Sequence, residues 1–294
     1  MIGPGIARRA GSVLAVVLAV AVTGVSRTDA AAGPARGADA PTVATPIDAY
    51  PGAAAAYLVA VDGRLIWARH PDLPRPPASL AKLLTAVVLL EDPRWDEAAR
   101  IEVSDAAAAV EGSQLGLRGG EALRAGDALT ALLLRSANDA CVALAEHFAG
   151  SVGQFVERMN ARAAALGMAD SRFGHPCGLD VAGQRSTARD LLRLAGFALG
   201  LPAIAARVTL ARAEIATLDG RRLSFVNGNA LVGRVEGVIG MKSGFTTRAG
   251  KCVIAIAQRG DHRVWLVMLG AGERWWTAAG MIDAAFEPFK PVAP

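Results

Sequence analysis

The sequence predicts an α+β fold, in which one antiparallel sheet is flanked by helices and accompanied by an all-helical lobe. Two observations support this fold class. Strand-like runs lie near both ends of the chain, at residues 57–68 and 235–269, whereas the residues between them follow a helical hydrophobic period. We therefore expect strands from the two ends to pair in a single sheet, and the middle block to pack as a separate helical lobe.

Turn and breaker residues define the first elements. Asp62-Gly63 is typical of a tight hairpin turn, and it separates two runs of strand-forming residues, Tyr57–Val61 and Arg64–Ala68. Prolines between residues 71 and 77 then enforce an extended backbone. A helix is expected to follow over about residues 79–90.

The middle of the chain is predicted to be helical. The stretch 127–149 should break around Ser136, an amphipathic helix should follow over 151–166, and another should begin after Ser186-Thr187. The last third is predicted to hold three strands and a closing helix, at Val235–Lys242, Cys252–Gln258, Arg263–Leu269 and about Ala271–Phe286.

The bulk composition argues against several classes of function. The chain has 294 residues and is 52% hydrophobic, enough for a sizeable core, and its formal net charge is only +4. The basic residues are scattered without interleaved aromatic residues, so no nucleic-acid partner is expected. Cys141, Cys177 and Cys252 lack metal-ligand spacing, and either one pair forms a disulfide or all three are small buried side chains. No metal or organic cofactor is expected.

The N-terminus has the pattern of a secretory signal peptide, expected over about residues 1–30. Arg8-Arg9 supply the charged start, the apolar run Gly11–Gly24 is short for a membrane span, and small residues follow it. An uncleaved anchor is the alternative. Residues 31–47 are expected to form a flexible linker before a single domain at 48–290. The protein should therefore be exported, to the periplasm or the exterior.

Lysine is rare in this chain, since the 31 basic residues include only four lysines. Unlike arginine, a lysine can lose its proton near neutral pH when it is buried or lies beside another cation. Lys82 follows Ser79 by three residues, which places both side chains on one face of the predicted helix. At the start of that helix, Ser79 suits a nucleophile and Lys82 its base. The alternative is a simple N-cap beside a solvated lysine.

Two further motifs follow in the chain. Ser136-Ala137-Asn138 falls at the predicted break between helices and offers a hydroxyl and an amide. Lys242-Ser243-Gly244 falls at the end of a predicted strand. Its lysine offers a positive charge, its serine a hydrogen bond to a carboxylate, and its glycine room for a substrate backbone. Each motif alone is ordinary, but the three in this order indicate an acyl-serine enzyme.

The three motifs together resemble the signature of penicillin-recognising serine enzymes. Over roughly residues 50–285 the chain is similar to serine-type D-alanyl-D-alanine carboxypeptidases, the low-molecular-mass penicillin-binding proteins. The segments that carry this resemblance are PASLAKLLT (77–85), SANDACVALA (136–145), FGHPCGLD (173–180), STARD (186–190), FVNGNAL (225–231) and GMKSGFTTRAG (240–250). The resemblance implies a β-lactamase/transpeptidase-like fold and removal of the terminal D-alanine from peptidoglycan stem pentapeptides through an acyl-serine.

The resemblance also assigns roles to residues. Its catalytic set would be Ser79, Lys82, Ser136, Asn138 and Lys242. Lys82 would take the Ser79 proton, Ser136 and Lys242 would relay a proton to the departing D-alanine, and Asn138 would steady the substrate amide. β-Lactams would be inhibitors that trap the same serine.

The substrate-binding set implied by the resemblance is Ser243, Gly244, Phe245, Thr246 and Arg248. The backbone N–H groups of Ser79 and Phe245 would form the oxyanion hole. Ser243 and Thr246, together with Lys242 and Arg248, would hold the terminal carboxylate. The stem peptide would lie antiparallel to the edge strand that ends at Lys242, as an added strand.

Two departures from the family pattern matter. Ser243 stands where the family usually has threonine, so the hydroxyl is kept and a methyl group is lost. The chain ends at Pro294, where many relatives continue into a β-rich domain and an amphipathic helix. We therefore expect no C-terminal accessory domain and at most weak membrane association.

Three other functions remain open. A class A β-lactamase would need a deacylating glutamate, but Glu157-Arg158-Met159-Asn160 lies inside a predicted helix, where two solvated side chains are expected instead. A D,D-endopeptidase that cuts peptide crosslinks would use the same catalytic residues. A non-catalytic cell-wall-binding or penicillin-binding protein would show no turnover, and the presence of all five catalytic side chains argues against it.

Overall fold

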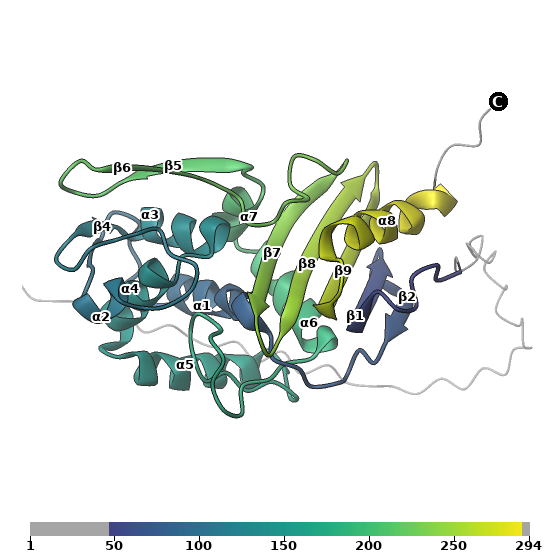
Figure 1. Cartoon of the computed structure of the whole chain (residues 1–294), viewed down its shortest axis with the longest axis horizontal. Helices are drawn as coiled ribbons and strands as arrows, with labels where there is room; N and C mark the ends of the chain where they lie inside the picture. Colours follow the sequence, from purple (N-terminus) through teal and green to yellow (C-terminus); the bar gives the residue numbers. More distant parts are fainter. Residues whose placement is uncertain (1–46, 290–294) are drawn as a thin grey trace, which may run out of the picture. The chain divides into compact units, whose positions relative to one another are not determined.

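The computed structural model of the chain describes residues 47–289. Its central sheet has five antiparallel strands in the order β2-β1-β9-β8-β7, as Figure 1 shows. These strands are β1 (Ala54–Val61), β2 (Arg64–Arg69), β7 (Val238–Thr246), β8 (Gly250–Arg259) and β9 (His262–Ala271). Because β1 pairs with both β2 and β9, the predicted union of strands from the two ends of the chain is confirmed. The expected signal peptide lies outside the described residues.

Both faces of the sheet are covered, which explains why its inner strands β1, β8 and β9 are apolar at most positions. Along β8, Val253 and Ala255 pack in the cluster that includes α8 (Arg274–Phe286), whereas Ile254 and Ile256 belong to the core shared with the helical lobe. Figure 1 shows α8 on one face of the sheet and α6 (Ala188–Leu199) on the other. The predicted closing helix is confirmed.

The predicted helices of the lobe are also confirmed. The short turn η1 (Ala78–Leu80) leads into α1, and α3 continues as the π-helical turn η2 (Ala131–Arg135) up to the break at Ser136. The remaining bounds are α1 (Ala81–Leu90), α2 (Asp105–Ala108), α3 (Ala125–Thr130), α4 (Asn138–Ala149), α5 (Val152–Ala165), α7 (Pro202–Val208) and η3 (Glu287–Phe289).

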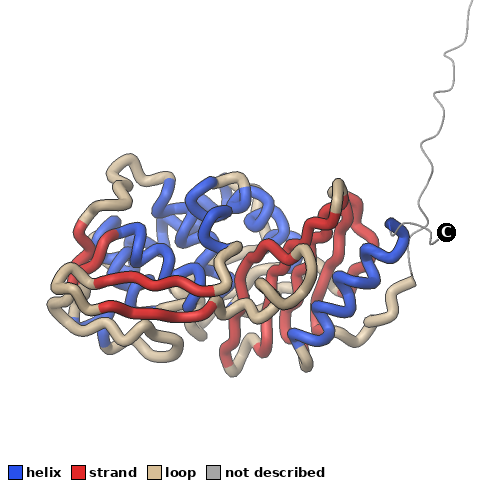
Figure 2. Tube along the Cα trace, turned by 90° about the horizontal axis from the view of Figure 1, so that it is seen from above, coloured by secondary structure: helices blue, strands red, loops and turns tan. Residues whose placement is uncertain are grey.

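The lobe is not made of helices alone. It also carries two two-stranded ribbons, β3 (Arg100–Glu102) with β4 (Ala122–Arg124), and β5 (Arg212–Ala216) with β6 (Arg222–Val226). Figure 2 shows the second ribbon alongside the helices. The expectation of an all-helical lobe was therefore incomplete. The strands of the first ribbon are too short to give a pattern, and those of the second are largely exposed.

The edge strand β7 extends further than predicted. It runs on past Lys242 to Thr246 and pairs with β8 along that length, so the Lys242-Ser243-Gly244 motif lies within the strand and not at its end. The pairing continues because β8 begins at Gly250, only a short turn away. As a result, Ser243 to Thr246 are presented by rigid sheet backbone.

Two smaller expectations can also be checked. Glu157 is exposed on α5, as expected, but Asn160 is only partly exposed and its side chain has internal partners. The Asn160 amide donates to the carbonyl oxygens of Val156 (2.9 Å) and Phe173 (2.8 Å), so it ties α5 to the segment that follows. All three cysteines are buried and unbridged, which confirms their interpretation as small buried side chains and removes the disulfide.

None of the helices in the described part of the chain is long and apolar enough to cross a membrane alone. Taken together, α6 and α7 are long and apolar enough for a membrane span, but the two helices are bent by 103° relative to each other.

Candidate active site

Ser79 lies in η1, the single turn that leads directly into α1, so its predicted place at the start of a helix is confirmed. Ala78 before it has a φ of +49°, a conformation that is rare for a residue with a side chain. Two glycines lie against this bend. A Cβ atom on Gly178 would lie 1.9 Å from the Ala78 carbonyl oxygen, and one on Gly244 would lie 2.8 Å from the Ser79 nitrogen. The backbone at Ala78-Ser79 therefore packs between Gly178 and Gly244, where no larger residue would fit.

Lys82 is completely buried beneath Ser79. Its Nζ atom lies 3.1 Å from the Ser79 hydroxyl oxygen, 2.7 Å from Asn138 Oδ1 and 2.7 Å from the carbonyl oxygen of Cys177. These three acceptors use all three donors of a lysine ammonium group. The structure thus joins the first two predicted motifs directly, and the same short contact allows a proton to move between Ser79 and Lys82.

The Ser136-Ala137-Asn138 segment bridges η2 and α4. Ser136 adopts a left-handed conformation (φ 63°, ψ 31°), which ends the π-helical turn and lets α4 begin at Asn138. Such turns are frequent at functional sites. The hydroxyl oxygen of Ser136 is buried and has no hydrogen-bond partner among the described residues. An unpaired buried hydroxyl is unfavourable, so this oxygen is available to a ligand or a proton relay.

Lys242 is also buried, with 1% of its surface exposed. Its Nζ atom donates to the carbonyl oxygen of Ser243 (3.1 Å), and no ion pair with a carboxylate is present in the described structure. Burial holds the pKa of Lys242 well below the ordinary lysine value, and the charges of Lys82 and Arg274 lower this pKa further. Lys242 is therefore suited to exchange a proton. No hydrogen bond joins it to Ser136.

The other predicted substrate-binding groups mostly have internal partners. The Ser243 hydroxyl donates to the Gly228 carbonyl oxygen (2.8 Å). The Thr246 hydroxyl and the Arg248 backbone N–H donate to the two carboxylate oxygens of Asp180, at 2.8 and 3.1 Å. The Phe245 side chain, in contrast, is 63% exposed.

A cavity of about 520 Å³ lies beside Ser79. Ser79 and Asn138 lie in its lining, and the other walls come from residues 111–113, 175, 178–181 and 245–247. The predicted residues Phe245 and Thr246 are thus on the cavity wall. Ser136, Lys242 and Ser243 are not among its lining residues.

Sequence reasoning missed two groups in this site. The carbonyl oxygen of Cys177 is a partner of Lys82, but a backbone atom leaves no signal in residue type. Arg274, at the start of α8, donates to the carbonyl oxygens of Gly244 (2.6 Å) and Cys252 (3.0 Å) and so braces β7 against β8. Nothing in the sequence distinguishes Arg274 from the many other arginines of the chain. No group of His, Cys, Asp or Glu suited to hold a metal ion is found in residues 47–289.

Comparison with known proteins identifies the family to which the chain belongs. Residues 44–273 match the Peptidase_S11 family, described as D-alanyl-D-alanine carboxypeptidase. The chain belongs to this family. The resemblance inferred from the motifs and the expected β-lactamase/transpeptidase-like fold are thereby confirmed.

Individual members of the S11 family show how far the similarity extends. The chain is 36% identical over 213 residues to a D-alanyl-D-alanine endopeptidase of Escherichia coli, covering 71% of this chain and 67% of that protein. It is 30% identical over 234 residues to the carboxypeptidase DacF of Bacillus subtilis, covering 78% of this chain but only 60% of the relative. A crystal structure of a Mycobacterium tuberculosis D-alanyl-D-alanine carboxypeptidase matches with a TM-score of 0.75 and 31% identity, over 83% of this chain and 96% of that one.

Proposed function

We propose that this protein is a serine D,D-carboxypeptidase that removes the terminal D-alanine from peptidoglycan stem pentapeptides. One observation carries the proposal. The Lys82 amine lies within hydrogen-bond distance of the Ser79 hydroxyl and of Asn138, and Ser79 opens onto a cavity beside an edge strand. Family membership supports the same reaction class.

In the proposed acylation step, the Lys82 amine accepts the proton of the Ser79 hydroxyl. The Ser79 oxygen then forms a bond to the carbonyl carbon of the penultimate D-alanine. The carbon–nitrogen bond to the terminal D-alanine breaks, and the leaving nitrogen takes a proton relayed through Ser136 and Lys242. The low pKa of Lys242, caused first by burial, supports this role because the amine can both give and take a proton.

The substrate would bind as an added strand on β7, which is one of the two edge strands of the sheet. The negative oxygen that develops on the carbonyl would face the backbone N–H groups of Ser79 and Phe245, and losing one such donor typically costs about 3–4 kcal/mol of barrier. Asn138 would steady the substrate amide from the opposite side. Water would then attack the ester, release the shortened peptide and restore Ser79.

A second candidate is a D,D-endopeptidase that cuts crosslinks between stem peptides. One observation favours it: the hydroxyls of Ser243 and Thr246, proposed to hold a free terminal carboxylate, both donate to internal partners, the Gly228 carbonyl oxygen and Asp180. The similarity to an endopeptidase of Escherichia coli agrees with it. In this candidate reaction the leaving group would be the neighbouring stem peptide and not a free D-alanine.

The proposed setting follows from the substrate. Peptidoglycan lies outside the cytoplasmic membrane, so we propose that the protein is exported by its N-terminal segment and acts in the periplasm or at the cell exterior. β-Lactams are the proposed inhibitors, because they would acylate Ser79 in place of the stem peptide.

Mass spectrometry of muropeptides tests the proposal. The mature protein is incubated with monomeric pentapeptides and crosslinked dimers, with Ser79→Ala as the matched control. Loss of one alanine from the monomer by the unmodified protein alone would establish the carboxypeptidase. Cleavage of dimers with intact monomers would establish the endopeptidase instead. If neither substrate changes, or if Ser79→Ala is still labelled covalently by penicillin, the proposed acyl-serine reaction is wrong.

A further inference from the structure

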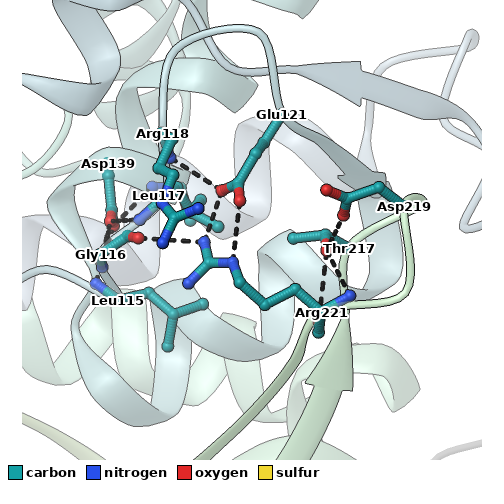
Figure 3. A network of polar contacts seen from close by, with 10 residues as sticks. Leu115, Gly116, Leu117, Arg118, Glu121, Asp139, Thr217, Asp219 and Arg221 are labelled. Carbon is teal, nitrogen blue, oxygen red and sulfur yellow. Dashed lines mark hydrogen bonds and ion pairs between the residues drawn. The ribbon is translucent and has the colours of Figure 1, made fainter.

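One wall of the catalytic cavity is a loop without regular secondary structure. This wall loop, Glu111–Leu117, follows α2 and contributes Glu111, Gly112 and Ser113 to the cavity lining. The backbone N–H and C=O groups of such a segment are not paired within a helix or sheet, so other groups must form hydrogen bonds with them to hold the segment in one conformation. In this protein those partners are a carboxylate behind the loop and an arginine in front of it, both drawn in Figure 3.

The carboxylate belongs to Asp139, which is completely buried. Its oxygens accept hydrogen bonds from the backbone N–H groups of Leu115 (2.9 Å), Gly116 (2.9 Å) and Leu117 (3.0 Å), and from its neighbour Ala140 (2.9 Å). Three successive loop N–H groups thus converge on one anion. A buried carboxylate is retained only with such partners, and each charge-assisted bond is stronger than a neutral one.

The wall loop in turn sets the orientation of Asn138. The Asn138 backbone N–H donates to the Ser113 carbonyl oxygen (2.7 Å), and its side-chain NH2 donates to the Glu111 carbonyl oxygen (2.6 Å). With the NH2 group held by Glu111, the other end of the amide, Oδ1, faces Lys82. If Glu111 moved away, the amide could turn and present N–H donors to the Lys82 donors, which would break the contact.

The arginine lies on the far side of the loop, in the turn between β5 and β6. Arg221 donates to the Gly116 carbonyl oxygen (3.0 Å) and to Glu121 (2.8 Å), which follows the loop. Figure 3 shows this side chain reaching from the ribbon to the loop. The next residue, Arg222, pairs instead with Glu214 across the ribbon and is exposed. The missed β5–β6 ribbon therefore braces the wall loop from outside.

We propose that Asp139 is a positioning residue for acylation, which holds the wall loop so that Asn138 keeps its oxygen on Lys82. Arg221 supports the same loop from the other side. The inference rests on the proposed function, because it concerns the step in which Ser79 is acylated. It makes the reactivity of Ser79 depend on a carboxylate that touches neither Ser79 nor Lys82.

The test measures the second-order rate of acylation of the full chain by a fluorescent penicillin, together with the thermal midpoint. Asp139→Asn keeps the shape of the side chain but replaces one acceptor oxygen by a donor. We expect acylation to slow by roughly 10- to 100-fold, because small displacements of catalytic groups have effects of that size. In an Asn138→Ala background the same substitution should slow acylation by less than about twofold, because its effect passes through Asn138.

Arg221→Gln is a second test of the wall loop if Asp139→Asn does not fold. Arg222→Gln is its matched control. Acylation should slow several-fold in the former and stay unchanged in the latter. Equal rates for Arg221→Gln and Arg222→Gln, or full additivity of Asp139→Asn with Asn138→Ala, would overturn the inference alone. If the unmodified protein is not acylated by penicillin at all, the proposed function fails as well.

Discussion

Lys82 and Lys242 lie in the same buried site, and the charge of Lys82 acts on Lys242. Burial is the larger cause, and together they hold the pKa of Lys242 well below the ordinary lysine value of 10.5. Their surroundings differ, because Lys82 has three acceptors whereas Lys242 has a single backbone carbonyl. In the proposed reaction, the two lysines would therefore perform different tasks.

The first prediction concerns stability. Between the lowered pKa and about 10.5, the unfolded chain binds a proton at Lys242 that the folded chain does not. Stability should therefore rise with pH across this window, and Lys242 destabilises the fold below it. Lys242→Met should raise the thermal midpoint near neutral pH while abolishing turnover, and its advantage should vanish toward pH 10.5. Calorimetry over a pH series checks this, and a midpoint lower than that of the unmodified protein at neutral pH would contradict it.

Arg274 should influence the pH dependence of the reaction. Its charge is the third cause that lowers the pKa of Lys242, after burial and Lys82. Arg274→Met removes this charge, so the pKa of Lys242 should rise and the acidic limb of the kcat/KM profile should move to higher pH. The exposed Arg263→Met is the control and should leave the limb in place. If Arg274→Met leaves the acidic limb of the kcat/KM profile unchanged, the ionisation of Lys242 does not control that limb and the prediction is wrong.

Gly178 should be far more sensitive to substitution than Gly183. Both have positive φ angles, +79° and +76°, so either alanine variant loses roughly 1–2 kcal/mol from the backbone alone. Only at Gly178 would the new Cβ overlap another atom, the Ala78 oxygen at 1.9 Å. Gly178→Ala should therefore displace Ser79 and abolish penicillin labelling, whereas Gly183→Ala should keep it. Denaturant unfolding and labelling on both variants provide the check.

Ser243→Thr should shift substrate preference. The Ser243 hydroxyl donates to the Gly228 carbonyl oxygen, and the β-branched side chain of threonine has fewer rotamers with which to do so. If the added methyl group turns the hydroxyl toward the substrate carboxylate, KM for a pentapeptide should fall several-fold with kcat within about twofold, in line with a gain of ground-state binding. Steady-state kinetics on monomers and crosslinked dimers measures it, and an equal change on both substrates would refute carboxylate recognition by Ser243.

Much of the fold could be predicted because its determinants are local. The Asp62-Gly63 turn, the break at Ser136 and the continuous apolar run in β8 each indicate an element within a few residues. The extension of β7 to Thr246 could not be predicted, since it depends on where β8 begins. The β5–β6 ribbon escaped notice because its strands mix exposed charged residues with few buried ones.

The candidate site divides in the same way. Ser79, Lys82 and Asn138 carry their chemistry in their side chains and lie in recognisable motifs, so their association could be inferred. The partners that orient them could not, because the Cys177 carbonyl is a backbone atom and Asp139 acts through backbone N–H groups of a distant loop. Such contacts exist only once the chain has folded.

The sheet order has a consequence for the nascent chain. Ser79 and Lys82 are synthesised early, but β7, which completes the site, begins only at Val238, and β1 gains its inner neighbour only with β9. Contacts between residues so distant in sequence form slowly. In the proposed reaction, a chain interrupted before β7 would carry the nucleophile without a substrate edge. Covalent labelling by penicillin would then report on the completion of folding as well as on the presence of the serine.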